Sequence, residues 1–423
     1  MISLFNKSKK ESLIKKSYNL INQGKYQEAL ECYDKVIEIY DLACKKQSFS
    51  QPSKSEISNA LEKDPNYIKA WFGKGLVLKE LGKYQEAFKA YDKALKIDPK
   101  QGTIWYNKGH ISIELGRYQD ALECYNNVLE LNSKDVSAWY RKGFILGELG
   151  RYQEALECYN KSLEIDPNYI IAWFNKSHTL KMLKKYQEAF KAYNKTLELD
   201  PNYVDAWIGK GVLLERVMKY DEELKCFNKA LKINPKDASA WFFKGNALIH
   251  LNRYPEALEC YNKSLELDPE SADTLSNKGN TLEDLGKFQE AIECYDKVLK
   301  LNPKSVDAWN NKGNALGKLS KFQEAIECFD KILEINSNDN IALYLKAFSL
   351  EKLGNHNEAL KYYDKSLEID PKKAPVWYLK GLSFEEHRKH ENALKCFNKA
   401  IKLDPSFEPA LKAKKDILNV KKQ

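Results

Sequence analysis

The sequence predicts an all-α solenoid of antiparallel helix pairs, because marker residues recur at one fixed spacing along most of the chain. Nine of the thirteen prolines share one phase, which includes Pro65, Pro99 and Pro405. Leu275 and Leu343 fill the only two gaps in a second, 34-residue series that holds every tryptophan. Self-similarity at such a period is typical of helical repeat arrays. The eight tryptophans are Trp71, Trp105, Trp139, Trp173, Trp207, Trp241, Trp309 and Trp377.

The unit at residues 68–101 shows why each repeat should be a helix pair. Trp71 and Gly75 lie on one stripe of helical spacing, and Gly82 supplies a permissive backbone where the first helix should end. Ala87 lies on the apolar stripe of a second helix, and Pro99 closes the unit because proline cannot continue a helix. Gly75 and Ala87 are small where the two helices should approach closely. A lone pair buries too little surface to be stable, so each unit depends on its neighbours.

These residues resemble the tetratricopeptide repeat, whose pattern runs W-x₂-L-G-x₂-Y, A-x₃-F and P over one period. Here the matching residues of one unit are Trp71, Gly75, Ala87, Tyr91 and Pro99. The resemblance covers residues 10–407 apart from one insertion, and it implies a right-handed superhelical solenoid. It also implies that the first helices of successive repeats line a concave groove, where an extended peptide or a partner helix binds.

The phase of the markers divides the chain into five parts. We expect a basic tail at residues 1–9, a first repeat at 10–43, and an insertion at 44–67 with a loop and a short helix near 54–63. Ten contiguous repeats should follow at 68–407, and a capping helix with a basic tail at 408–423. Glu223 stands where the other repeats have alanine, so we expect a loosened joint near 215–225.

The composition indicates a protein without a membrane span or a signal peptide, and a cytoplasmic location is expected by default. Of the net charge of +8, residues 1–16 carry +4 and residues 408–423 carry +3, so the repeats are nearly neutral. Eight of the nine cysteines share one repeat position, where they should be packing residues; only Cys44 lies outside the pattern. Neither a disulfide nor a metal site is expected from them.

No catalytic constellation is present, so we expect neither an enzyme, nor a cofactor, nor a small-molecule substrate. The segment 313–318 resembles a phosphate loop but lacks one residue of the spacing and the Ser or Thr after the lysine. His356 and His390 replace the tyrosine that begins the second helix in other repeats. His387 and His390 are neighbours on a helix without a clear third ligand, so no metal site is predicted.

The groove positions implied by the resemblance hold aromatic side chains in the early and late repeats, and asparagines with acids between them. Because an amide both donates and accepts, an asparagine ladder can pair with a ligand peptide bond; the alternative is that these are ordinary surface asparagines. Nearby acids favour a basic partner segment. The assigned residues are Phe72, Tyr106, Tyr140, Phe144, Phe174, Phe242, Asn246, Asp273, Asn277, Asn280, Asp284, Asp307, Asn310, Asn311, Asn314, Tyr344, Phe348 and Tyr378.

The expected partners are therefore other proteins, and the function is that of a non-catalytic interaction scaffold. The alternative is an RNA-binding helical repeat, which would need a basic groove. The groove positions hold seven basic against twelve acidic side chains, which disfavours nucleic acid. A lysine precedes the repeat glycine in ten units, as at Lys74 and Lys108; its stem should pack while its ammonium reaches water, the alternative being a ligand-binding ladder. The identity of the partner and the oligomeric state stay open.

Overall fold

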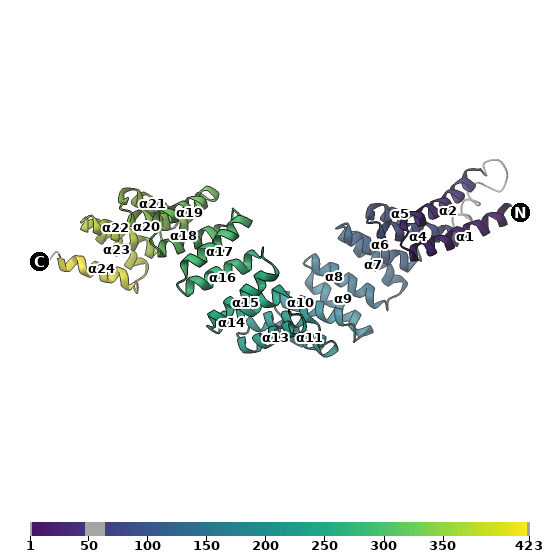
Figure 1. Ribbon diagram of the computed structural model, residues 1–423, viewed down its shortest axis with the longest axis horizontal. Coiled ribbons are helices and arrows are strands. Elements are labelled where there is room, and N and C mark those ends of the chain that lie inside the picture. The colour runs from purple at the N-terminus through teal and green to yellow at the C-terminus, as the bar shows by residue number, and fades with distance from the viewer. Residues whose placement is uncertain (1, 47–63, 421–423) are drawn as a thin grey trace. The chain divides into compact units, whose positions relative to one another are not determined.

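The computed structural model describes residues 2–46 and 64–420, and every regular element in these two ranges is an α-helix (Figure 1). The all-α prediction is confirmed. The expected loop and short helix at 47–63 lie outside the described residues. The helices are α1 (Ile2–Asn22), α2 (Tyr26–Lys46), α4 (Pro65–Glu80), α5 (Tyr84–Ile97), α6 (Gly102–Glu114), α7 (Tyr118–Leu131), α8 (Val136–Glu148), α9 (Tyr152–Ile165), α10 (Ile170–Met182), α11 (Tyr186–Leu199), α12 (Val204–Glu215), α13 (Tyr220–Ile233), α14 (Ala238–His250), α15 (Tyr254–Leu267), α16 (Ala272–Asp284), α17 (Phe288–Leu301), α18 (Val306–Lys318), α19 (Phe322–Ile335), α20 (Asn340–Lys352), α21 (His356–Ile369), α22 (Ala374–Glu386), α23 (His390–Leu403) and α24 (Glu408–Val420).

The chain forms two compact units, Met1–Leu213 and Leu214–Gln423. In the first unit α4 packs on α5, α6 on α7, α8 on α9 and α10 on α11. In the second unit the pairs are α14 with α15, α16 with α17, α18 with α19, α20 with α21, and α22 with α23. In each of these pairs a first helix meets a second helix, and the second helices α5, α7, α9, α15, α17, α19 and α21 also contact the first helix of the next pair. The repeat therefore builds a continuous core within each unit.

Each first helix ends in a residue with positive φ, as the glycine phase predicts. Gly82 has φ +70° and Gly116 has φ +68°. At five equivalent positions the residue is not glycine but still takes this conformation, with φ between +57° and +60°. The left-handed conformation costs a non-glycine residue about 1–2 kcal/mol, because its Cβ crowds the following carbonyl. The five residues are Lys184, Met218, Asn252, Ser320 and Arg388.

Replacing Met218 with glycine should raise the free energy of unfolding by about 1 kcal/mol. The left-handed strain is removed, and the greater freedom of glycine in the unfolded chain offsets part of the gain. The Met218 side chain is 76% exposed, so little packing is lost. Urea unfolding followed by circular dichroism measures the change. Gly82→Ala is the matched control, because it should shift the midpoint in the opposite direction.

The recurring tryptophan fastens each turn to the helix that follows it. Trp105 Nε1 donates to the carbonyl of Pro99 at 2.8 Å, and Trp377 Nε1 donates to that of Pro371 at 3.0 Å. Five further tryptophans make the same bond to the carbonyl six residues earlier, at 2.9 Å. The shared spacing of tryptophan and proline therefore has one cause, since the indole bonds the backbone of the turn that the proline forms.

In most repeats the core is an aromatic side chain on the second helix seated against a glycine of the first; Ser177 of α10 and Ala347 of α20 take the place of this glycine. A Cβ added to Gly75 would lie 2.3 Å from Tyr91 Cε1, and one added to Gly245 would lie 2.5 Å from Tyr261 Cε1. Tyr91 and Tyr261 are at most 1% exposed, and Ala87 is fully buried. The predicted close approach of the two helices is confirmed. The eight cysteines that share this repeat position are buried, as their phase predicts.

At the amino-terminal end of the described chain the structure extends beyond the sequence assignment. Helix α1 begins at Ile2, so residues that we assigned to a basic tail belong to the first helix. At the other end, α24 packs on α23, in the place expected for a capping helix. Among the described residues, no helix has the length and apolar character needed to cross a membrane.

Candidate functional site

The first helices of several neighbouring repeats contact one another within each unit. In the first unit α8 contacts α10, and in the second unit α14 contacts α16 and α16 contacts α18 (Figure 1). We call the surface made by α14, α16 and α18 the first-helix face of the second unit. All of the asparagines assigned to the groove come from these three helices.

The aromatic groove residues of the first unit are partly used by the core. The rings of Phe72 and Tyr91 have centroids 6.0 Å apart, and Tyr106 and Tyr125 have centroids 5.5 Å apart. Tyr140 is only 6% exposed, so it belongs to the core more than to a surface. Phe144 and Phe174 are half-buried. Phe72, Tyr106, Phe144 and Phe174 are therefore only partly exposed to a ligand.

In the second unit the aromatic positions behave in the same way. Phe242 contacts Tyr261 with centroids 6.3 Å apart, and Tyr378 contacts Phe397 at 5.9 Å. Tyr344 and Phe348 of α20 are half-buried, and Lys373 Nζ lies 5.1 Å from the centroid of Tyr344. Each assigned aromatic therefore has at most a partly exposed ring to offer.

The asparagines form two hydrogen-bonded pairs that cross from one repeat to the next. Asn277 Nδ2 donates to Asn246 Oδ1 at 3.0 Å, and Asn311 Nδ2 donates to Asn280 Oδ1 at 3.0 Å. We call these four residues the asparagine ladder. Their contacts establish that the sequence positions singled out as a groove lie side by side on adjacent first helices.

The ladder also has a structural role that the sequence analysis did not anticipate. Tyr261 donates its hydroxyl to Asn246 Oδ1 at 2.8 Å, and Tyr295 donates to Asn280 Oδ1 at 2.8 Å. Where another residue replaces the asparagine, the core tyrosine loses this acceptor: the hydroxyls of Tyr91 and Tyr125 have no partner among the described residues. Each of the two accepting Oδ1 atoms is thus filled by a tyrosine and a second asparagine.

Two assigned asparagines lie outside these pairs. Asn310 Oδ1 is buried and has no hydrogen-bond partner in the described part of the chain. Asn314 is half-buried. The core aromatic residue of its own repeat is Phe329, which has no hydroxyl to donate to the asparagine. The Oδ1 atom of Asn310, which follows Trp309 on α18, is thus an acceptor that the ladder does not use.

The acidic residues near the ladder are exposed. Asp273, Asp284 and Asp307 are all exposed, and Asp273 and Asp307 lie in the first turns of α16 and α18. A carboxylate in a first turn interacts favourably with the helix dipole, so part of their role is structural. Glu283 is half-buried, and burial raises the pKa of its carboxyl above the usual range. The three exposed carboxylates give this face a negative charge.

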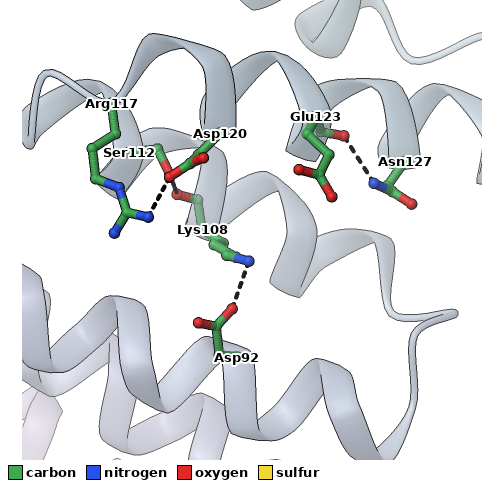
Figure 2. A network of polar contacts seen from close by, with 7 residues as sticks. All are labelled: Asp92, Lys108, Ser112, Arg117, Asp120, Glu123 and Asn127. Carbon is green, nitrogen blue, oxygen red and sulfur yellow. Dashed lines mark hydrogen bonds and ion pairs between the residues drawn. The ribbon is translucent and has the colours of Figure 1, made fainter.

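In five repeats the lysine at this position pairs with an aspartate, so the expectation that its ammonium reaches water is wrong there. Figure 2 shows Lys108 of α6 pointing at Asp92 of α5, with Nζ 2.5 Å from the carboxylate oxygen. Lys346 pairs with Asp330 at 2.5 Å and also donates from Nζ to the Tyr362 hydroxyl at 2.9 Å. Equivalent pairs join Lys74 to Asp34, Lys312 to Asp296 and Lys380 to Asp364.

Most lysines of the series also lie over the tryptophan of their own helix, as Lys108 does with Nζ 5.2 Å from the Trp105 centroid and Lys176 with Nζ 4.7 Å from that of Trp173. An ammonium within about 6 Å of an aromatic centroid is attracted to the ring face. The ion pairs therefore join helices of neighbouring repeats, and the cation–π contacts to tryptophan hold the lysine against its own helix. The acidic partner lies sixteen residues before the lysine in four of the five pairs, a spacing that the sequence already contains.

Three further side chains converge where sequence reasoning saw no site. Glu351, His356 and His387 each offer one ligand atom, and these atoms lie within 4.8 Å of one another. His356 Nδ1 is 2.6 Å from Glu351 Oε1, and the rings of His356 and His387 have centroids 4.0 Å apart. The sequence analysis paired His387 with His390; the structure instead pairs it with His356. The signal that could have found this is that both histidines replace the usual residue of their repeat position.

The comparisons with known proteins agree on one repeat family. The tetratricopeptide repeat model matches residues 68–101, 103–135, 136–169, 238–271, 272–305, 306–339, 341–373 and 374–407. Two further tetratricopeptide repeat models match 11–41 and 158–191. The model of the protein prenyltransferase alpha subunit repeat matches 220–251. No curated protein matches the sequence.

Solved structures with similar repeats cover parts or nearly all of the chain. YrrB, described as a TPR protein with an unusual peptide-binding site, is 30% identical over 45% of this chain and 99% of its own, with a TM-score of 0.39. The C-terminal part of a TPR repeat-containing protein from Cytophaga hutchinsonii is 19% identical over 56% and 98%, with a TM-score of 0.49. The Cut9–Hcn1 hetero-tetramer of the APC/C matches at 16% over 97% and 96%, with a TM-score of 0.43.

Proposed function

Because this chain belongs to the tetratricopeptide repeat family, we propose that it is a non-catalytic scaffold that binds a segment of a partner protein along its first helices. Its repeats are those of a protein-interaction scaffold. The asparagine ladder is the observation that carries the more specific proposal. It makes the first-helix face of the second unit the place where an extended segment binds.

The hydrogen bonds inside the ladder leave a defined set of groups for a ligand. The Oδ1 atoms of Asn246 and Asn280 are filled, so their Nδ2 groups are the available donors. Asn277 and Asn311 use Nδ2 inside the ladder and keep Oδ1 as an acceptor. Each pair thus offers at least one N–H donor and one carbonyl acceptor, which is enough to complement one peptide group. Such pairing holds a backbone without selecting its side chains.

The surrounding charges add a preference to this backbone pairing. Asp273, Asp284 and Asp307 are exposed around the ladder, and the preferred segment therefore carries lysine or arginine beside apolar residues. The apolar residues would contact the exposed edges of Phe242 and of the aromatic residues on α20. The same charges count against RNA, whose phosphates they would repel. Random RNA in a filter-binding titration at physiological salt should show no submicromolar affinity.

We expect Asn277→Ala combined with Asn311→Ala to weaken peptide binding by about tenfold to a hundredfold. Two amide hydrogen bonds at roughly 0.5–1.5 kcal/mol each account for this range. Peptides selected on the wild-type chain from a displayed random library, and then titrated by fluorescence anisotropy, provide the measurement. The selected sequences should be rich in basic residues, and their affinity should fall as salt is added.

The first unit offers a matched control at the same repeat position. Asn107 and Asn175 donate from Nδ2 to backbone carbonyls of their own helices, at 2.8 Å each, and belong to no ladder. Asn107→Ala combined with Asn175→Ala should therefore leave the affinity unchanged. If the ladder variant stays folded and binds the selected peptides as tightly as this control, the ladder is not the binding site.

A further inference from the structure

A histidine pair and a carboxylate meet at the junction between the two repeats formed by α20 with α21 and by α22 with α23. Glu351 is in the last turn of α20, His356 is the first residue of α21, and His387 caps the end of α22. We propose that these three side chains bind one Zn²⁺ or a similar first-row divalent cation. Two imidazoles and one carboxylate are a ligand set that such cations favour.

The distances between the ligand atoms fit a single ion. At metal–ligand distances of about 2.0–2.2 Å, tetrahedral ligand atoms lie roughly 3.3 Å apart. The three atoms here lie within 4.8 Å of one another, and His356 Nδ1 is 2.6 Å from Glu351 Oε1. Small changes in side-chain torsions bring the three to a common distance. The ion would replace the hydrogen bond between His356 and Glu351 with two bonds to itself.

The carboxylate is already oriented by a residue of the next repeat. Ser383 of α22 donates its hydroxyl to Glu351 Oε2 at 2.6 Å, so Oε1 is left to face the histidine. The Glu351 side chain is only 9% exposed, which limits its alternative conformations. A polar partner that fixes a ligand in this way is common behind metal ligands in proteins. The arrangement is that of an oriented ligand set and not of a loose surface cluster.

A cleft beside the three residues leaves room for a fourth ligand. Its volume is about 510 Å³, and its lining includes His356, His387, Glu358 and Lys389. Water would complete the coordination from this side, as in three-ligand zinc sites that keep one open position. The bound ion would connect the hairpin of one repeat to the first helix of the next.

The two histidines are departures from the repeat at two separate positions. The residue equivalent to His356 is tyrosine in most repeats, such as Tyr84, and the residue equivalent to His387 is leucine, such as Leu353. The residue equivalent to Ser383 is alanine in two other repeats, at Ala247 and Ala315. Both histidine replacements occur at one junction, where they bring their rings together.

These departures supply variants that the fold already tolerates. In His356→Tyr, His387→Leu and Ser383→Ala, the new residue is the one that sister repeats hold. His390→Tyr is the matched control, because His390 occupies the same repeat position as His356 but is not part of the group. The full-length chain is used without an affinity tag and with Cys44→Ser as background, so that neither a tag nor this thiol binds the metal.

Calorimetric titration of the chelator-treated chain with zinc chloride tests the proposal. The wild type should bind one ion per chain, and its melting temperature should rise with zinc. His356→Tyr and His387→Leu should each weaken binding by more than about a hundredfold, and Ser383→Ala by about tenfold to a hundredfold. His390→Tyr should bind as the wild type does, and circular dichroism should show the same helix content in all variants.

X-ray absorption of the zinc-loaded wild type provides a second readout, in which two imidazoles and oxygen ligands should be seen. Absence of stoichiometric zinc binding by the wild type would overturn the proposal. Equal affinity of His356→Tyr and His387→Leu with the wild type would do the same. Neither result depends on peptide binding, so this site is tested independently of the scaffold function.

Discussion

Replacing Glu223 with alanine is expected to stabilise the chain by on the order of 3–5 kcal/mol above pH 8, and by much less near pH 5. Glu223 occupies the repeat position that holds alanine in every other repeat, such as Ala189 and Ala257. Glu223 is only 2% exposed, and its Oε2 has no hydrogen-bond partner among the described residues. Burial raises the pKa of its carboxyl from 4.5 to about 8, and the nearby Glu215 adds to the rise.

The sign of the pH dependence follows from the two pKa values. Below about 4.5 the folded and unfolded chains both hold the proton, so no buried charge destabilises the fold. Between about 4.5 and 8 only the unfolded chain loses it, and stability falls as the pH rises. Above pH 8 the Glu223 carboxyl is ionised in both states, and the full free-energy cost of burying its charge is reached. At about 1.4 kcal/mol per pH unit between these values, the cost reaches the range given above.

Urea unfolding of the wild type and of Glu223→Ala at several pH values measures this effect. Glu223→Gln is the control, because it keeps the size of the side chain and removes its charge. The stability of this variant should not show the pH dependence of the wild type. A difference between wild type and Glu223→Gln that is constant from pH 5 to 9 would contradict the assignment. The sequence predicted a loosened joint near 215–225, and the boundary between the two units falls just before it, after Leu213.

Two alanine substitutions four residues apart in α18 should change stability in opposite directions. Gly313→Ala should cost about 2 kcal/mol, because its Cβ would lie 2.7 Å from Phe329 Cε1 in an already filled core. Phe329 is 2% exposed, so its ring has no space into which to move. Gly317→Ala should gain nearly 1 kcal/mol, because no atom lies within 4 Å of the added Cβ and alanine favours the helix.

Thermal unfolding of the two variants beside the wild type distinguishes the effects of packing and helix propensity. Adding Phe329→Leu to Gly313→Ala should recover part of the loss, because a smaller side chain leaves room for the new methyl group. If Gly313→Ala and Gly317→Ala shift the melting temperature in the same direction, the tight crossing of α18 and α19 is not what requires glycine at position 313.

Within one helix pair, the sequence was sufficient to predict the structure. The spacing of Trp71, Gly82 and Pro99 defines two helices and their turn, because helix periodicity and backbone preferences act over a few residues. The close approach of the two helices at Gly75 and Ala87 was predicted for the same reason. The family resemblance was confirmed because these local signals repeat in register along the chain.

Contacts between repeats were harder to predict, because they depend on how far one helix pair is rotated and shifted against the next. The asparagine positions were identified, but the tyrosine hydroxyls that fill Asn246 and Asn280 were not. The lysine series was recognised, yet its ammonium groups were expected in water and instead pair with aspartates such as Asp92. In both cases the partner belongs to another helix, and only packing decides which atoms meet.

By itself, the sequence determined the helix pair, its period, the family and the residues available on each first helix. The tertiary structure alone decided which of these residues touch. It joined Asn246 to Asn277 across two repeats and placed His356 beside His387, 31 residues later in the chain. The physical reason is that the period of a repeat is encoded in local backbone preferences, whereas a binding site between repeats requires the angle and offset at which their helices pack.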